Sequence, residues 1–246
     1  MSNFQRKLNK RKNKYKSKTN KQDSLMKRVG LVVQLSKNRR DQKLSNKRIL
    51  ISSFSQIKPP KLSEWERVKL PHKNQLYFMK NDLESNDDDL KKKTLCLIRR
   101  MITVEDNPPL SFVIASGIIE NIVNFAENST DPYILFESCW IICNVASGST
   151  TYTQTLFRYN IVNIFANLLK TKNTAVFELV VWAFGNLAGG EMKYRELILE
   201  NDNVLSRILS YSSILNPPDS LITIVCWSLS NLVNVNNRTH QNQVIN

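Results

Sequence analysis

A tryptophan followed four residues later by an asparagine occurs three times in the chain, as Trp140-Ile-Ile-Cys-Asn144, Trp182-Ala-Phe-Gly-Asn186 and Trp227-Ser-Leu-Ser-Asn231. Positions i and i+4 of a helix lie one turn apart on the same face, so each pair would act as one unit. An asparagine amide offers a donor and an acceptor, the pair needed to hold the backbone of an extended peptide. A tryptophan face accepts the aliphatic stem and charged head of Lys or Arg. The predicted ligand is therefore an extended, basic peptide.

These motifs belong to an internal repeat. The tryptophans are 42 and 45 residues apart, and a second motif that begins at Gly117, Asn160 and Asn203 recurs at 43 and 43 residues. Gly and Asn favour the backbone conformation that ends one helix before the next. Helix-start signals precede each tryptophan segment, at Asp131-Pro132, Asn173-Thr174 and Pro217-Pro218. Periods of about 40–47 residues are typical of HEAT and armadillo repeats, and a short first helix favours armadillo.

The expected fold class is all-α: a right-handed armadillo solenoid of about four repeats over residues 86–246. No single unit could bury its apolar faces, so neighbouring units must stack. Two interpretations of the Trp and Asn pairs remain. Either the tryptophans pack in the core and the asparagines bond locally, or the pairs form an exposed ladder along a groove. We favour the exposed ladder, because burying three equivalent asparagines would leave several polar groups to satisfy.

The net charge of +14 is unevenly distributed. Residues 1–50 carry 17 of the 35 Lys and Arg but only two acidic residues, whereas Met101–Val235 carries six basic and twelve acidic residues. We expect residues 1–50 to be a basic arm that folds against an acidic partner, and residues 51–85, with three prolines, to be a linker. Such a charge asymmetry indicates an interaction tail.

Composition argues against several classes of protein. The four cysteines include no CxxC pair and only two histidines exist, so we expect no metal site, no cofactor and no enzyme. Cys139 and Cys143 lie one helical turn apart, but without further ligands we interpret them as core residues. No apolar run approaches the roughly 18 residues that cross a bilayer, so no membrane partner is expected.

From these residues, the chain resembles the importin-α family of nuclear import adaptors. Residues 26–50 are similar to that family's importin-β-binding segment, and Lys12-Asn-Lys-Tyr-Lys16 to the lysine-rich element before it. Asn107-Pro-Pro-Leu resembles the start of the first armadillo repeat, and the three Trp and Asn motifs resemble the second to fourth repeats. The resemblance implies an adaptor that shuttles between cytoplasm and nucleus and binds an importin-β-type receptor and cargo proteins.

The resemblance also implies which residues take part. The cargo signal would be held by Trp140, Asn144, Gly148, Thr153, Trp182, Asn186, Glu191, Trp227 and Asn231. The receptor would bind the arm through Lys12, Lys14, Arg28, Lys37, Arg39, Arg40, Lys43, Lys47 and Arg48.

Two departures from the family pattern concern the pocket for the most selective lysine of the signal. The family has an aspartate four positions after the third-repeat asparagine, where this chain has Gly190 followed by Glu191. The family also has a Lys-Arg-Arg run in the arm that occupies the groove, where this chain has Asn46-Lys47-Arg48. Either the pocket has lost lysine selectivity on both sides, or Glu191 replaces the aspartate. In both cases we expect weaker self-inhibition by the arm.

Other interpretations remain open. The arm alone would bind nucleic acid nonspecifically. It has few aromatic residues for base stacking and the repeat body is acidic, so we do not expect nucleic acid to be the ligand. A generic armadillo scaffold without signal binding is a further alternative. The resemblance stops after the third Trp and Asn motif, which resembles the fourth repeat, so we expect a C-terminally shortened family member. Its last helix would expose a stacking face and favour self-association.

Overall fold

A computed structural model of the chain describes residue 7 and residues 67–104, 108–211 and 219–233. The chain divides into two units, Met1–Asn46 and Lys47–Asn246. All structural findings below concern the second unit. The predicted receptor-binding residues of the arm lie outside the described residues, as do residues 51–66 of the predicted linker.

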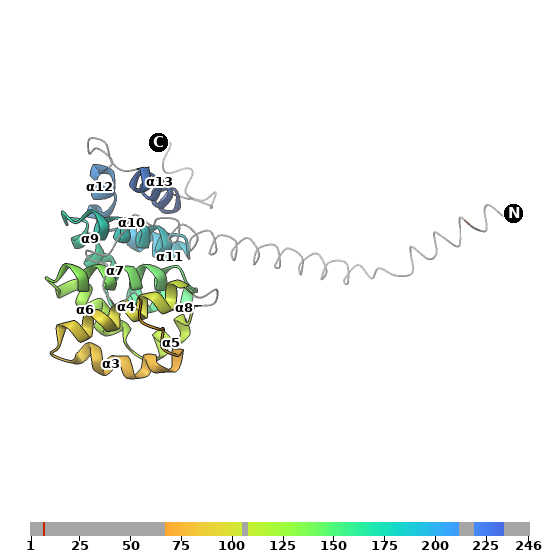
Figure 1. Ribbon diagram of the computed structural model, residues 1–246. Coiled ribbons are helices and arrows are strands. Elements are labelled where there is room, and N and C mark those ends of the chain that lie inside the picture. Colours follow the sequence, from red (N-terminus) through yellow and green to blue (C-terminus); the bar gives the residue numbers. More distant parts are fainter. Residues whose placement is uncertain (1–6, 8–66, 105–107, 212–218, 234–246) are drawn as a thin grey trace, which may run out of the picture. The chain divides into compact units, whose positions relative to one another are not determined.

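Every regular element of the described residues is a helix (Figure 1). The elements are η2 (Lys73–Gln75), α3 (Leu76–Glu84), α4 (Asp88–Val104), α5 (Leu110–Ala115), α6 (Ile119–Asn128), α7 (Pro132–Ala146), α8 (Thr150–Arg158), α9 (Ile161–Leu168), α10 (Thr174–Ala188), α11 (Met192–Leu199), α12 (Asp202–Tyr211) and α13 (Asp219–Leu232).

The helices from α5 onward form three units of three, α5–α7, α8–α10 and α11–α13, and the pair α3–α4 precedes them. The third helix of each unit packs on its predecessor: α7 lies against α4, α10 against α7, and α13 against α10. Nearly every residue of α7 and α10 is buried, since each of these helices is covered by neighbours on both sides. The all-α armadillo prediction is confirmed.

Two of the three predicted turns between helices are found, whereas the third position, Asn203, lies inside α12 and does not adopt a left-handed turn. Gly117 and Asn160 adopt the left-handed conformation, with φ of 75° and 56°, just before α6 and α9. Asn173 caps α10 by accepting hydrogen bonds from the N–H groups of Ala175 and Val176. The Asn173 side chain thus satisfies two N–H donors that a helix start leaves without a partner inside the helix.

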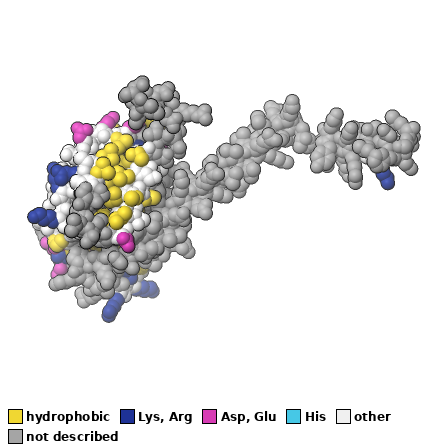
Figure 2. Space-filling model, turned by 90° about the horizontal axis from the view of Figure 1, so that it is seen from above, with side chains coloured by type: hydrophobic (Ala, Val, Ile, Leu, Met, Phe, Trp, Pro, Cys, Tyr) yellow, Lys and Arg dark blue, Asp and Glu magenta, His cyan; other side chains and the backbone are white. Residues whose placement is uncertain are grey.

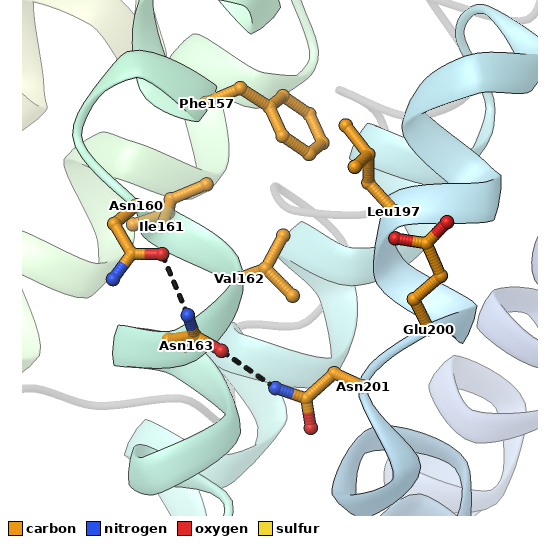
Figure 3. A pocket seen from close by; sticks show the side chains of 8 residues that line it. All are labelled: Phe157, Asn160, Ile161, Val162, Asn163, Leu197, Glu200 and Asn201. Atoms are coloured by element: carbon orange, nitrogen blue, oxygen red, sulfur yellow. Dashed lines mark hydrogen bonds between the residues drawn. The ribbon is translucent and has the colours of Figure 1, made fainter.

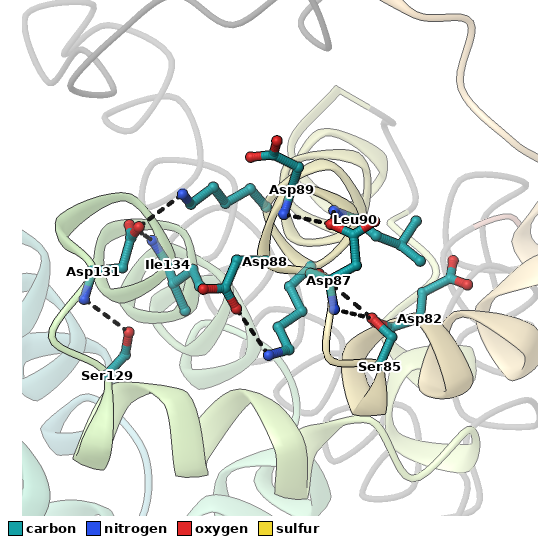
Figure 4. Close-up of polar contacts among 11 residues, drawn as sticks. Asp82, Ser85, Asp87, Asp88, Asp89, Leu90, Ser129, Asp131 and Ile134 are labelled. Carbon is teal, nitrogen blue, oxygen red and sulfur yellow. Dashed lines mark hydrogen bonds and ion pairs between the residues drawn. The ribbon is translucent and has the colours of Figure 1, made fainter.

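Two aspartates start α4 and α7 and are drawn in Figure 4. Asp87 Oδ1 accepts from the N–H of Asp89 and of Leu90, at 2.9 and 3.1 Å. Asp131 caps α7, and its carboxylate also lies 2.8 Å from Lys92 Nζ on α4. Asp131 therefore joins the cap of one helix to the helix beside it.

Replacing Asp131 by alanine should lower the free energy of unfolding by about 1 kcal/mol at pH 7. Partial burial acts to raise the pKa of Asp131, but the hydrogen bonds from Lys92 and the α7 backbone outweigh it, so the pKa lies below its usual value. A lowered pKa gives stability that is present above the unfolded value of about 3.9 and is lost as the pH falls through the folded value. Urea unfolding of both proteins across this pH range measures the difference.

Asp131→Asn, which keeps an acceptor without charge, is the control. A difference between Asp131 and Asp131→Ala that is the same at every pH would contradict this account.

The linker prediction is wrong for its last part. Helix α3 lies within residues 51–85, and its Leu76, Met79 and Leu83 are buried. They recur at spacings of three and four, so they form one apolar stripe that packs against α4. The prolines earlier in the segment and its mixed polar composition mask this stripe in the sequence.

The end of the stack where α12 and α13 lie shows a patch of hydrophobic side chains (Figure 2). On the α13 segment Ile222 and Val233 are 45% and 58% exposed, and Cys226 between them is exposed. The residues 45 positions earlier at the two ends of this stripe, Phe177 and Ala188, are fully buried. The exposed stripe therefore corresponds to the face that α10 uses to contact the next unit. Self-association through this face stays a prediction.

Candidate functional site

The three Trp and Asn pairs lie on the third helices of successive units, α7, α10 and α13. Because these helices pack one on the next, the pairs recur at equivalent positions along the stack. The rings of Trp182 and Trp227 are neighbours, with centroids 6.2 Å apart and planes inclined at 57°. The structure thus brings together the side chains that the repeat pattern singled out.

The asparagine amides join one unit to the one before it. Asn186 Nδ2 donates to the carbonyl of Cys143 at 3.1 Å, and Asn231 Nδ2 donates to the carbonyl of Gly185 at 2.9 Å. In both cases the acceptor is the residue just before the asparagine of the preceding unit. Asn144, which follows Cys143 directly, donates to the hydroxyl of Thr103 on α4 at 3.4 Å. The asparagines form a regular ladder across the helices.

The prediction that this ladder is exposed is wrong for its first two pairs. Trp140 and Asn144 are 8% and 5% exposed, and Trp182 and Asn186 are both 2% exposed, whereas the pair on α13 is half-buried. The interhelix hydrogen bonds offset the desolvation free energy that burial of the amide donors would otherwise cost. Burial is possible because a backbone carbonyl of the preceding helix accepts a hydrogen bond from the asparagine amide, as for Asn186 and Asn231. The expectation of an exposed ladder did not include this acceptor.

One part of the ladder retains an unused acceptor. Asn186 Oδ1 is buried and has no hydrogen-bond partner among the described residues. The amide donor of the same side chain is already engaged with Cys143. The chemistry left at this position is therefore acceptance of one N–H group.

Gly185 sets how closely α13 approaches α10. A Cβ atom at this position would lie 2.3 Å from the ring of Trp227 and 2.6 Å from Ser228 Oγ. The Ser228 hydroxyl in turn donates to the carbonyl of Val181 at 2.8 Å. The ring of Trp227 thus occupies space that any larger residue at position 185 would fill.

The other residues expected to hold the signal lie at the junctions that follow α7 and α10. Thr153 is buried, and its hydroxyl donates to the carbonyl of Ser149 at 3.3 Å within the same turn. A Cβ at Gly148 would meet the ring of Tyr152 at 2.5 Å. Glu191 is exposed at the start of α11 and forms an ion pair with Lys193 at 2.8 Å. Its carboxylate is therefore already paired within its own helix.

Gly190 differs from Gly148 in the space around it, although each follows its asparagine by four positions. The nearest atom to a Cβ at Gly190 is the carbonyl oxygen of Leu187, at 3.4 Å, and the backbone is not left-handed there. A side chain can therefore be added at position 190 without strain.

A buried cluster at the first end of the ladder is not evident from the Trp and Asn motifs. Arg99 Nε lies 2.6 Å from Glu137 Oε2, and the two side chains are 8% and 0% exposed. The guanidinium carbon of Arg99 is 5.0 Å from the centroid of Trp140. Arg99 and Thr103 lie 41 residues before Trp140 and Asn144, so a search for the repeat period without requiring tryptophan would have found this pair.

A separate hollow of about 350 Å³ lies between the first two helices of two units (Figure 3). Its lining includes the apolar side chains of Phe157 and Leu197. Asn163 donates to Asn160 Oδ1 and accepts from Asn201 Nδ2, both at 2.8 Å. These amides bond one another across the two units.

The interpretation of Cys139 and Cys143 as core residues agrees with their complete burial. Burial raises the pKa of the Cys139 thiol, which keeps it protonated. No group of three or more His, Cys, Asp or Glu side chains within the described ranges could hold a metal ion. Among those same ranges, no helix is both long enough and apolar enough to span a bilayer.

No family model matches the sequence. Among curated proteins, the chain is 28% identical over 224 residues to importin subunit alpha-6 of Arabidopsis thaliana. The aligned region covers 90% of this chain and 41% of that protein. It is 29% identical over 244 residues to a probable importin subunit alpha-A of Dictyostelium discoideum, covering 90% of this chain and 44% of that protein. The chain thus matches less than half the length of these relatives.

Among solved structures, the fold is similar to designed armadillo repeat proteins. One of them, solved in complex with the peptide (KR)4, has a TM-score of 0.58 at 20% identity over 64% of each chain. Another, designed for modular peptide recognition, has a TM-score of 0.57 at 17% identity over 63% of each chain. These similarities support the armadillo fold.

Proposed function

We propose that the chain is a member of the importin-α family and an adaptor of nuclear protein import. In this proposal the Trp and Asn ladder of α7, α10 and α13 holds the Lys/Arg-rich signal of a cargo protein. The basic arm binds an importin-β-type receptor, and the adaptor shuttles between cytoplasm and nucleus. The observation that carries the proposal is the regular ladder of tryptophans and asparagines on successive third helices.

The chemistry of the ladder supports an extended basic peptide as ligand. The half-buried ring of Trp227, which lies beside Trp182, presents aromatic surface at one end of the ladder. Cation–π contacts with Lys or Arg are worth about 0.5–2 kcal/mol each. The amide oxygen of the half-buried Asn231, whose Nδ2 donates to the Gly185 carbonyl, suits a backbone N–H group. A peptide that alternates backbone contacts with basic side chains would use both.

The charge distribution supports the same ligand. Residues 101–235 carry a net charge of −6, whereas residues 1–50 carry +15. An acidic surface raises the local concentration of a cationic peptide and speeds its association. The arm itself has the chemistry of such a peptide, so arm and cargo would compete for one groove. We expect this competition to be weaker than is usual in the family, since Asn46 and Gly190 stand where the family pairs lysine with aspartate.

Replacing Asn144, Asn186 and Asn231 together by alanine should weaken binding of a Lys/Arg-rich peptide at least tenfold. The three amides form the hydrogen bonds that position the helices of the ladder. Each such bond is worth about 0.5–1.5 kcal/mol, and the loss of three together exceeds the 1.4 kcal/mol of a tenfold change. Fluorescence anisotropy with a labelled peptide and the full chain measures the affinity.

The matched control is the double variant Asn163→Ala/Asn201→Ala, which removes an interhelix amide bond outside the ladder. It should lose stability without a specific loss of peptide binding. Equal affinity in the triple variant and the unmodified chain would identify the protein as an armadillo scaffold that does not bind signals. Receptor binding is tested separately, by capture of residues 1–50 on an importin-β-type receptor.

A further inference from the structure

The Trp140 indole is surrounded by side chains of its own chain. Arg99 lies over its ring, with the guanidinium carbon 5.0 Å from the centroid. The Phe136 ring meets it edge to face, with centroids 5.3 Å apart and an interplanar angle of 76°. Glu137 holds the guanidinium through Nε, at 2.6 Å, and is fully buried. The position and orientation of the cation over the ring are therefore fixed from within the fold.

Arg99 stands where the later units have tryptophan. It lies 41 residues before Trp140, and Thr103 lies 41 residues before Asn144, so α4 carries Arg and Thr at the spacing of the later Trp and Asn pairs. Thr103 takes part in the ladder, since its hydroxyl accepts from Asn144. The first row of the ladder thus presents a cation to Trp140, whereas Trp182 and Trp227 present aromatic rings to one another.

We propose that Arg99 is a built-in cationic ligand of Trp140, which fills the first aromatic slot of the ladder and limits how many basic side chains a bound peptide can place there. The inference rests on the proposed function, because it concerns the same groove. Basic side chains of the signal then bind on the side of the Trp140 ring that faces α10. The slot on the α4 side is occupied from within the chain, and Arg99 is a specificity-determining residue.

Removing the cation should turn this cluster into an empty binding position. Truncating Arg99 leaves the Glu137 carboxylate buried beside an open aromatic face. A carboxylate and an aromatic ring together favour a guanidinium group, through charge and cation–π attraction. The vacated position should therefore accept a guanidinium group from solution or from a peptide arginine.

The first experiment uses ethylguanidinium as the probe and needs no signal peptide. In the full chain with Arg99→Ala, we expect millimolar ethylguanidinium to raise the unfolding temperature saturably by several degrees. The double variant Arg99→Ala/Glu137→Ala should show no such rise, because it lacks the carboxylate. If Arg99→Ala is unfolded, recovery of helical circular dichroism with the probe serves as the readout. An equal response in the double variant, or none in either protein, would overturn the proposal.

The second experiment measures which basic residues of a peptide contribute to binding. A Lys/Arg-rich peptide is substituted by alanine at one position at a time and bound to each protein. In Arg99→Ala, one additional basic position should become important by at least fivefold, whereas Arg99→Lys should keep the pattern of the unmodified chain. Arg99→Met/Glu137→Met, which replaces the ion pair by apolar side chains, tests the pattern if the alanine variant does not fold; it should remove the charged site and gain no position.

The two experiments separate the inference from the proposed function. Saturable rescue by ethylguanidinium without any peptide binding would support the built-in ligand and refute the signal-binding role. Peptide binding with an unchanged position pattern in Arg99→Ala would refute the role of Arg99 and leave signal binding in place.

Discussion

Replacing Gly185 by alanine is expected to lower the free energy of unfolding by about 1–3 kcal/mol and to weaken peptide binding at the same time. The added Cβ would lie 2.3 Å from the Trp227 ring and 2.6 Å from Ser228 Oγ. The ring and the hydroxyl cannot both move aside, because Ser228 is bonded to the carbonyl of Val181. Helix α13 must shift away from α10, which would also strain the bond from Asn231 to the Gly185 carbonyl.

Gly190→Ala is the matched control for this prediction. Its Cβ would make only a contact of 3.4 Å with the Leu187 carbonyl oxygen, so stability should hardly change. Chemical unfolding followed by circular dichroism gives the stability of each protein. The change in tryptophan fluorescence reports whether Trp227 has moved. Equal stabilities of the two alanine variants would show that the contact between α10 and α13 tolerates a methyl group.

Gly190→Asp is expected to strengthen binding of a Lys/Arg-rich peptide by about tenfold to a hundredfold. A hydrogen bond to a charged group contributes about 1.5–3 kcal/mol, and 1.4 kcal/mol corresponds to a tenfold change. The backbone at position 190 accepts a side chain, and the position follows Asn186 by four residues at the junction before α11. The substitution introduces the carboxylate that the resemblance to importin-α implies at this place.

Gly190→Asn separates hydrogen bonding from charge in this prediction, since it has the same shape without the negative charge. Alanine substitution at each lysine of the peptide then locates the effect. The gain from Gly190→Asp should disappear when one particular lysine is removed. A gain that survives every single substitution would indicate general attraction to a more acidic surface and would contradict a specific lysine pocket.

The repeat period and the turn residues were readable from sequence because they depend on local chemistry. A period of 42 to 45 residues between tryptophans can come only from recurring structural units, and Asn160 and Gly117 adopt the left-handed turns that their residue types favour. The cap at Asp131 followed from the same local rules. In contrast, the stripe of α3 was hidden by the polar composition of its surroundings.

The burial of the ladder could not be read in the same way. Whether Asn186 is exposed depends on how closely α10 approaches α7, and therefore on whether the Cys143 carbonyl is within reach. That distance is set by packing between helices about 43 residues apart in sequence. The local sequence pattern contains no information about this interhelix distance. Arg99 and Glu137, which are 38 residues apart, were missed for the same reason.

Sequence alone determined the armadillo architecture, the positions of the Trp and Asn pairs and the separation of charge between arm and repeats, because residue type, spacing and composition suffice for each. Tertiary structure alone decided which polar groups the ladder satisfies internally, that Gly185 admits the Trp227 ring, and that a cation from α4 lies on Trp140. These features depend on distances between stacked helices, which only the packing of the units establishes.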